Sequence, residues 1–274
     1  MRHDARHWTE ARTAIAHLAP KFVSVVREST PVGAVLGHWG TGEIAAHVSH
    51  VIRLDGDALA GTPLPHAELR PDAVAEVTDA ELAADPERDP EVLAERVEAQ
   101  LAEFLGRTER PASESVTWLG GVQLPASAVM CHLLEELLVH GYDLATAGGR
   151  SWPIAPTHAA LAIVGAGAPI VTAAGPTAFV NPRHASGFRA RFDIRLRGQE
   201  GVTVDFDEGL TIRVGAEARN GKPFDAHISA DPAAMLLLML NRVKPGPLAL
   251  RGKVFVWGRR PWRVPRMVAA MSPP

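Results

Sequence analysis

Two histidines and a glutamate recur at four-residue intervals between residues 132 and 145. His132, Glu136 and His140 lie in the segment HLLEELLVHGYDLA, which has no proline and no glycine before Gly141. Such a segment is expected to be helical, and residues four apart on a helix share one face. Leucines share that face, where ionisable groups must pair or bind a metal. Carboxylate and imidazole are good ligands for a divalent cation, whereas the alternative is a solvated stripe with a helical Glu–His pair.

A further histidine occupies an apolar position in an earlier segment, residues 39–50. Thr41 can cap a helix there, and His47 would lie on its apolar stripe. A lone histidine on such a face is more often a satisfied core residue than a ligand. Combined with Glu136 and His140, however, it could complete a set of three ligands that leaves coordination positions open, as catalytic metal sites do.

The two segments together resemble a known family. Trp39 precedes His47 by eight residues, and Glu136-x-x-x-His140 runs into Gly-Tyr-Asp-Leu-Ala. This pattern resembles the mycothiol-dependent maleylpyruvate isomerase family, whose N-terminal domain is a four-helix bundle of the DinB type. The resemblance implies that His47, Glu136 and His140 bind a divalent metal, usually zinc, and that mycothiol is the thiol cosubstrate. The second half looks similar to the sterol-carrier-like domain of many members.

Some ligand assignments stay open from the sequence. His50 is an alternative to His47, and Glu135 or His132 is an alternative to Glu136, although Glu135 points about 100° away from Glu136 on a helix. Asp143, one turn beyond the last predicted ligand, is a candidate partner for that histidine's second ring nitrogen.

The resemblance also implies a basic residue from the second half of the chain. In the family an arginine of the C-terminal domain reaches the active site. Arg242 is the candidate, with Arg251 next, because a guanidinium can hold a substrate carboxylate in a bidentate pair.

Charge divides the chain near its middle. Residues 1–150 contain 12 Lys and Arg against 23 Asp and Glu, whereas residues 151–274 contain 16 against 8. With the proline-bearing segment 151–156, this reversal predicts a boundary between Gly148 and Thr157. We expect a two-domain α+β protein. The resemblance implies that a metal-binding DinB-like four-helix bundle spans 1–150 and that a sterol-carrier-like antiparallel sheet with helices spans 151–274.

Four helices are expected in the first half, at about 8–28, 42–60, 90–107 and 125–147. The acidic stretch between the second and third is interpreted as a solvated connection. In the second half, the uncharged segment 158–180 is interpreted as a buried helix rather than a membrane span, because two prolines interrupt it and no aromatic belt flanks it.

Period-two alternation then predicts several strands and one apolar helix. The strands are expected at 188–197, 202–206, 210–215, 224–230 and 253–257, and the helix at 233–240. An apolar helix across a sheet could hold an apolar ligand, although a plain hydrophobic core explains the same pattern.

Composition narrows the partners and the compartment. Cys131 is the one cysteine, which excludes an intramolecular disulfide and fits a reducing cytosol, and the N-terminus has no apolar signal segment. Cys131 itself could be a nucleophile, although a buried inert thiol is commoner. The pI of about 6.5 argues against nucleic acid, despite a basic C-terminal run with two tryptophans. A cytoplasmic protein without membrane or nucleic-acid partners is expected.

The expected function is thiol chemistry at a divalent metal. A free thiol is mostly protonated at neutral pH, whereas a coordinating thiol is deprotonated and can attack an electrophilic small molecule. Isomerisation of a maleylpyruvate type and thiol S-transfer both fit. Alternatives are an apolar-ligand carrier with a non-catalytic metal site, a metal-dependent hydrolase and a partner-binding module.

Overall fold

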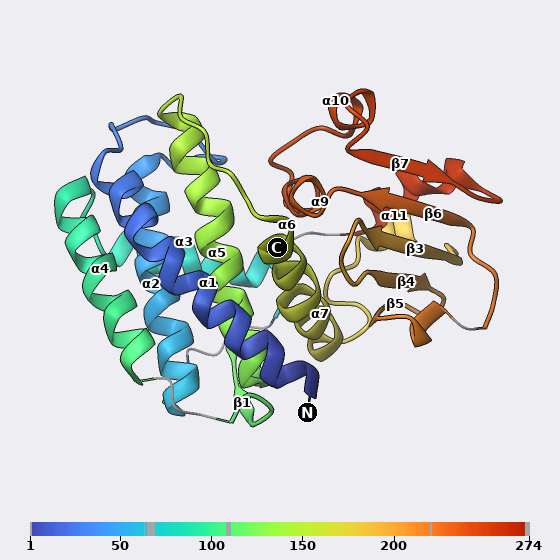
Figure 1. The fold of residues 1–274 in the computed structure, drawn as a ribbon, viewed down its shortest axis with the longest axis horizontal. Helices are drawn as coiled ribbons and strands as arrows, with labels where there is room; N and C mark the ends of the chain where they lie inside the picture. Colours follow the sequence, from blue (N-terminus) through green and yellow to red (C-terminus); the bar gives the residue numbers. More distant parts are fainter. Residues whose placement is uncertain (1, 63, 65–68, 108–110, 220, 272–274) are drawn as a thin grey trace. The chain divides into compact units, whose positions relative to one another are not determined.

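The chain forms two compact units in the computed structural model (Figure 1). The structure describes residues 2–62, 64, 69–107, 111–219 and 221–271. The first unit comprises Met1–Glu68 with Ala73–Ile154, and the second comprises Leu69–Asp72 with Ala155–Pro274. The predicted α+β class is confirmed, since the first unit is mainly helical and the second combines helices with a five-stranded sheet. The assignment of separate roles to residues 1–150 and 151–274 stays a prediction.

Long helices build the first unit at the four predicted places. They are α1 (Arg2–Arg27), α2 (Thr41–Ala60), α4 (Pro90–Arg107) and α5 (Ala126–Ala147). Both α1 and α2 pack against α4 and against α5, so the helices enclose one apolar core. Their inward residues are fully or almost fully buried, including Ile15, Phe22, Ile44, Leu93, Leu101, Leu133 and Leu137. The contact between α2 and α5 brings the two candidate segments together.

The ends of α2 are set by glycines rather than by the predicted threonine cap. Gly40 is the N-cap residue, and its backbone N–H donates to the Glu43 carboxylate at 2.9 Å. Thr41 is already helical, and its hydroxyl donates to the Thr30 carbonyl at 3.0 Å. Gly61 ends the helix in the left-handed region at φ 80°, which glycine adopts without strain. The sequence prediction that Thr41 caps the helix is therefore wrong.

Two further elements were not predicted in the first unit. The acidic connection contains a helix, α3 (Pro71–Ala84). Among the described residues of this helix, Leu82 alone is buried. A short hairpin pairs β1 (Ser115–Thr117) with β2 (Gln123–Pro125) across the turn η1 (Leu119–Gly121). A helix with so narrow an apolar stripe gives little periodic signal, which explains why a solvated loop was predicted instead.

The second unit is built on a sheet of order β5-β4-β3-β6-β7. The strands lie within the predicted ranges: β3 (Ala190–Leu196), β4 (Val202–Phe206), β5 (Leu210–Val214), β6 (Ala226–Ala230) and β7 (Val254–Trp257). The sheet is mixed rather than antiparallel as predicted, because β6 pairs parallel to β3. The reason is topological. After three strands joined by hairpins, the chain crosses back through the turn η3 (Glu217–Arg219) and adds β6 at the opposite side of β3.

Helices complete the second unit. The uncharged segment forms α6 (Pro156–Leu161), a π-helical turn (Ala162–Gly167) and α7 (Ala168–Ala174). The helix α6 packs against α9 (Pro232–Met239), and α7 packs against β5. The remaining helical elements are α8 (Pro182–Ala185), α10 (Pro245–Leu250), η4 (Pro261–Arg263) and α11 (Val264–Ala270).

The helical run Pro156–Ala174 is long and apolar enough to cross a membrane, judged by length and composition alone. No other helix among the described residues is both long and apolar enough. Its most apolar window is 56% buried in the folded chain. A core helix of a globular protein has the same properties, so the run is weak evidence for a membrane span.

Candidate metal centre

The structure brings the three predicted ligands together between α2 and α5. His47 projects from α2, while Glu136 and His140 project from one face of α5. The Oε2 atom of Glu136 lies 3.2 Å from His47 Nε2 and 3.3 Å from His140 Nε2. One ligand atom from each residue therefore lies within 4.8 Å of the other two. Two imidazole nitrogens and one carboxylate oxygen converging on one point form a donor set that suits a divalent cation such as zinc.

The three side chains are largely withdrawn from water. The exposed fractions of the His47, Glu136 and His140 side chains are 15%, 18% and 7%. The His47 ring lies 5.1 Å from the His140 ring at near right angles, and 5.0 Å from the ring of Trp39. The spacing of Trp39 and His47 in the sequence thus corresponds to an aromatic contact, which limits the rotation of His47.

Asp143 fixes the orientation of His140. Its Oδ2 atom lies 3.0 Å from His140 Nδ1, and both side chains are buried. We assign the ring hydrogen to Nδ1, which donates to the carboxylate, so that Nε2 is the atom directed at Glu136. The predicted pairing of Asp143 with this histidine is present in the structure, in the arrangement that metal-ligating histidines commonly show.

Burial and pairing move the pKa values of the three groups in different directions. Burial lowers the pKa of His47, because the charged ring loses its hydration. Burial also opposes charge on His140, but hydrogen bonds to Asp143 and Glu136 outweigh it and raise its pKa to about 9. Likewise, burial opposes ionisation of Glu136, but hydrogen bonds from His140 and His47 hold its pKa well below the usual value. The shared hydrogen bonds therefore favour an ionised Glu136 carboxylate in a place that is largely withdrawn from water.

His132, which the sequence offered as an alternative metal ligand to Glu136, lies beside the cluster and pairs with Asp55. Its Nδ1 atom lies 2.8 Å from Asp55 Oδ2, and its Nε2 atom lies 3.5 Å from Glu136 Oε1. It therefore faces Oε1 of Glu136, whereas His47 and His140 both contact Oε2. Asp55 is fully buried and was missed in the sequence, although it replaces an apolar residue in the stripe Val48, Ile52 and Leu59 of α2. That break in periodicity is the signal that could have found it.

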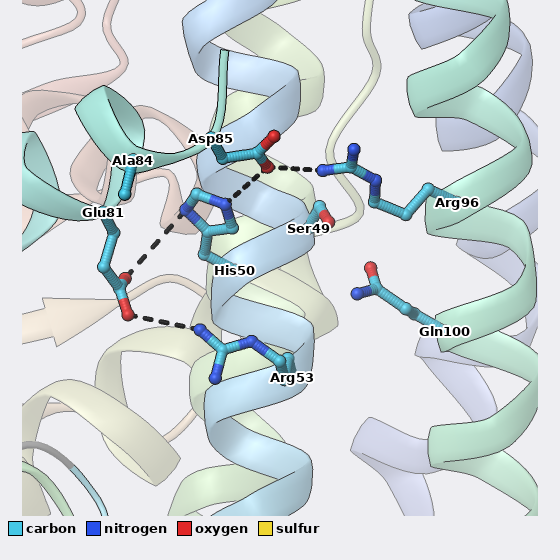
Figure 2. Close-up of a pocket in the computed structure, with 8 residues that line it drawn as sticks. All are labelled: Ser49, His50, Arg53, Glu81, Ala84, Asp85, Arg96 and Gln100. Atoms are coloured by element: carbon cyan, nitrogen blue, oxygen red, sulfur yellow. Dashed lines mark hydrogen bonds and ion pairs between the residues drawn. The ribbon is translucent and has the colours of Figure 1, made fainter. Parts of the chain in front are cut away.

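His50, the alternative to His47, belongs to a separate network outside the cluster. Its Nε2 atom lies 2.9 Å from Asp85 Oδ2, and Asp85 also pairs with Arg96 at 2.5 Å (Figure 2). The side chains border a pocket of about 360 Å³ between α2, α3 and α4. Lining it are Ser49, His50, Arg53, Glu81, Ala84, Asp85, Arg96 and Gln100. In this pocket each carboxylate forms an ion pair with an arginine: Glu81 with Arg53, and Asp85 with Arg96. The Glu136 carboxylate pairs with histidines instead.

Two other residues singled out in the sequence are Cys131 of the first unit and Arg242 of the second. Cys131 is fully buried, and burial raises its pKa far above that of a free thiol, so the inert interpretation fits and a nucleophilic role does not. Arg242 follows α9 in the second unit, half-buried, with its guanidinium donating to the Leu240 carbonyl at 2.7 Å. Its role toward a substrate stays a prediction.

Comparison with known proteins places the cluster within a recognised domain. Residues 22–145 match the family described as mycothiol maleylpyruvate isomerase N-terminal domain. The chain is similar to the crystal structure of a histidine-to-alanine mutant of the mycothiol-dependent maleylpyruvate isomerase, with a TM-score of 0.50 and 17% identity over 92% of each chain. For the crystal structure without that mutation, the TM-score is 0.48 at 18% identity, over 89% of this chain and 91% of the other. No curated protein matches the sequence. At such identity the structural likeness concerns the fold.

Proposed function

We propose that this chain is a mycothiol-dependent enzyme acting on a small electrophile, because residues 22–145 match the mycothiol maleylpyruvate isomerase N-terminal domain family. The observation that carries the proposal is the convergence of His47 Nε2 and His140 Nε2 on Glu136 Oε2, inside the matched domain. The reaction class is isomerisation of a maleylpyruvate type or transfer of the thiol to the electrophile.

The donor set suits a divalent metal, with zinc as the metal that the family resemblance favours. His47, Glu136 and His140 would hold the ion, and Asp143 would keep the second of these histidines in its ligating tautomer. A bound divalent cation supplies the means to deprotonate a thiol at neutral pH. Two neutral imidazoles and one carboxylate leave a net charge of +1 with such an ion, which favours an anionic fourth partner.

The surroundings of the cluster also support thiol chemistry. Trp39 lies against His47, and the Glu136 side chain is only 18% exposed, so the electrostatic attraction between charged groups is less screened than in water. A thiolate formed there can add to an electron-poor carbon. Addition to one carbon of a conjugated double bond moves the electron pair onto the conjugated carbonyl group and leaves a single bond that can rotate. If the thiolate then leaves, the double bond reforms and the substrate is isomerised; if the adduct instead takes up a proton from solvent, the product is a thioether.

The decisive experiment measures the dependence on metal and on mycothiol separately. Zinc-loaded protein should isomerise maleylpyruvate only when mycothiol is present. Removal of the metal with a chelator should abolish turnover, and added zinc should restore it. Metal-dependent cleavage of a substrate by water in the absence of mycothiol would favour the hydrolase instead. A lack of turnover with every electrophile tested, together with lipid retained in native mass spectrometry, would favour the apolar-ligand carrier.

Arg242 is proposed to bind the substrate carboxylate. Arg242→Ala should raise KM by about tenfold or more, because a guanidinium–carboxylate pair contributes about 1.5–3 kcal/mol. Metal content should stay stoichiometric. Arg189→Ala, which removes an exposed arginine of the same unit that is not a candidate for the site, is the matched control. Equal kinetics in the Arg242 variant and the parent protein would remove Arg242 from the proposed site.

A further inference from the structure

A second histidine–carboxylate pair lies on the far side of Glu136 from the candidate metal position. His132 precedes Glu136 by one turn of α5, and Asp55 follows His47 by two turns of α2. The atoms run in sequence from Asp55 Oδ2 to His132 Nδ1 at 2.8 Å and from His132 Nε2 to Glu136 Oε1 at 3.5 Å. A chain of polar contacts therefore ends on Oε1 of Glu136, whereas the contacts of His47 and His140 are to Oε2.

The outer end of this chain is held firmly. Asp55 is fully buried, and both of its carboxylate oxygens have partners. Trp118, beside the β1–β2 hairpin, donates its indole N–H to Asp55 Oδ1 at 2.9 Å. The Trp118 ring also packs edge-on against the His132 ring, with centroids 4.8 Å apart. A buried carboxylate is costly unless it is paired in this way, so the pair has a fixed geometry rather than a mobile one.

We propose that Asp55 and His132 are positioning residues that direct Oε2 of Glu136 toward the metal and hold Oε1 away from it. This inference rests on the proposed function, because it assumes that His47, Glu136 and His140 bind an ion. Asp55 orients the imidazole, and the imidazole restrains one oxygen of the ligand carboxylate. Such outer partners commonly change metal affinity by about 10- to 100-fold.

The arrangement matters because a glutamate can bind an ion through one oxygen or through both. Its side chain has several rotatable bonds, and in the absence of a restraint it could turn both oxygens toward the ion or swing aside. With Oε1 held by His132, Glu136 occupies a single coordination position. A position then remains for the thiol, as in catalytic rather than structural zinc sites.

The geometry argues against His132 as a ligand in its own right. Its Nδ1 atom is engaged by Asp55, and its Nε2 atom faces Glu136 Oε1 rather than the point shared by the other two histidines. Within the described part of the chain, the ligand group at this place whose atoms lie within 4.8 Å of one another comprises His47, Glu136 and His140 without His132.

The test compares two matched histidine–carboxylate pairs on the full-length protein. Asp55→Asn, His132→Gln and the double variant remove the proposed restraint. His50→Gln and Asp85→Asn alter an analogous pair that does not contact Glu136. Zinc affinity is measured by competition with a chromophoric chelator, and cobalt(II) is added as a spectroscopic probe of coordination number.

The expected result is a loss of zinc affinity of about 10- to 100-fold in both single variants of the positioning pair. The zinc affinity of the double variant should equal that of the more affected single variant, because Asp55 acts on Glu136 only through His132. The cobalt absorption bands should shift as Glu136 loses its one-oxygen restraint, whereas both control variants keep the parent affinity and spectrum. A role in folding alone would lower the unfolding temperature without shifting the bands.

Failure of this inference is distinguishable from failure of the proposed function. If the parent protein binds neither zinc nor cobalt, the metal site itself is wrong. If the parent binds both, and the folded His132→Gln protein matches it in affinity and spectrum, the positioning role alone is overturned. His132→Gln decides the matter if Asp55→Asn does not fold.

Discussion

The helix α2 carries two histidine–carboxylate clusters only three residues apart, and they differ in how charge is balanced. His47 shares one oxygen of Glu136 with His140, and no arginine contact to that carboxylate occurs in the described residues. His50 instead pairs with Asp85, which also binds Arg96. The second network is neutralised by side chains of the protein. The first has ligand atoms from three side chains converging on one point, which is why we infer a metal site at His47 rather than at His50.

The largest expected difference between the clusters is in metal content. Glu136→Ala should lose stoichiometric zinc, with affinity falling by more than about 100-fold, because removing a ligand costs more than removing an outer partner. Asp85→Ala should keep one zinc per chain, although both changes delete a carboxylate next to a histidine. Elemental analysis after dialysis measures the content, and far-UV circular dichroism checks that both proteins are folded. Full zinc occupancy in Glu136→Ala would refute the ligand set.

The histidines provide a second, independent comparison. His47→Ala and His140→Ala should each weaken zinc binding by more than about 100-fold, whereas His50→Ala should leave it unchanged. Chelator competition gives the affinities. If His50→Ala lost zinc and His47→Ala kept it, the alternative assignment from the sequence would be correct and the network of Figure 2 would have to rearrange on binding.

A smaller effect on zinc affinity is expected from Asp143, which contacts a ligand histidine rather than the metal position. Asp143→Asn removes the carboxylate that holds Nδ1–H of His140, so zinc affinity should fall by about tenfold. The folded fraction should stay near that of the parent, because asparagine can still accept the hydrogen bond. Equal affinities of variant and parent for zinc would show that the negative charge of Asp143 does not contribute to metal binding.

The smallest expected effect is on stability in acid, and it belongs to the arginine-balanced network. Burial opposes ionisation of Asp85, but hydrogen bonds from His50 and Arg96 lower its pKa from 3.8 to about 2. A pKa lowered by folding stabilises the protein above about pH 4, and the benefit is lost as the pH falls toward 2. Urea unfolding should therefore show a decrease of about 1 kcal/mol between pH 5 and pH 2.5 in the parent that Asp85→Asn lacks, after allowance for screening by water. Parallel pH profiles of the two proteins would exclude this contribution.

The sequence by itself determined the parts of the site that depend on a single helix. Because residues four apart on a helix share a face, Glu136 and His140 had to lie together, and Asp143 had to lie beside them. The alternation of apolar and charged residues likewise located the strands from β3 onward, since a strand buried on one face repeats every second residue.

Only the tertiary structure decided what depends on contacts between elements. His47 and His50 both lie near the apolar side of α2, and helix periodicity cannot say which of them meets α5 and which meets Asp85. Asp55 and Trp118, 63 residues apart, meet through packing that no local pattern encodes. The parallel pairing of β3 with β6 is of the same kind, because alternation specifies the faces of a strand and not its neighbour. Local periodicity specifies which face of a helix or strand a side chain occupies, whereas the residue that it contacts is decided only by tertiary packing.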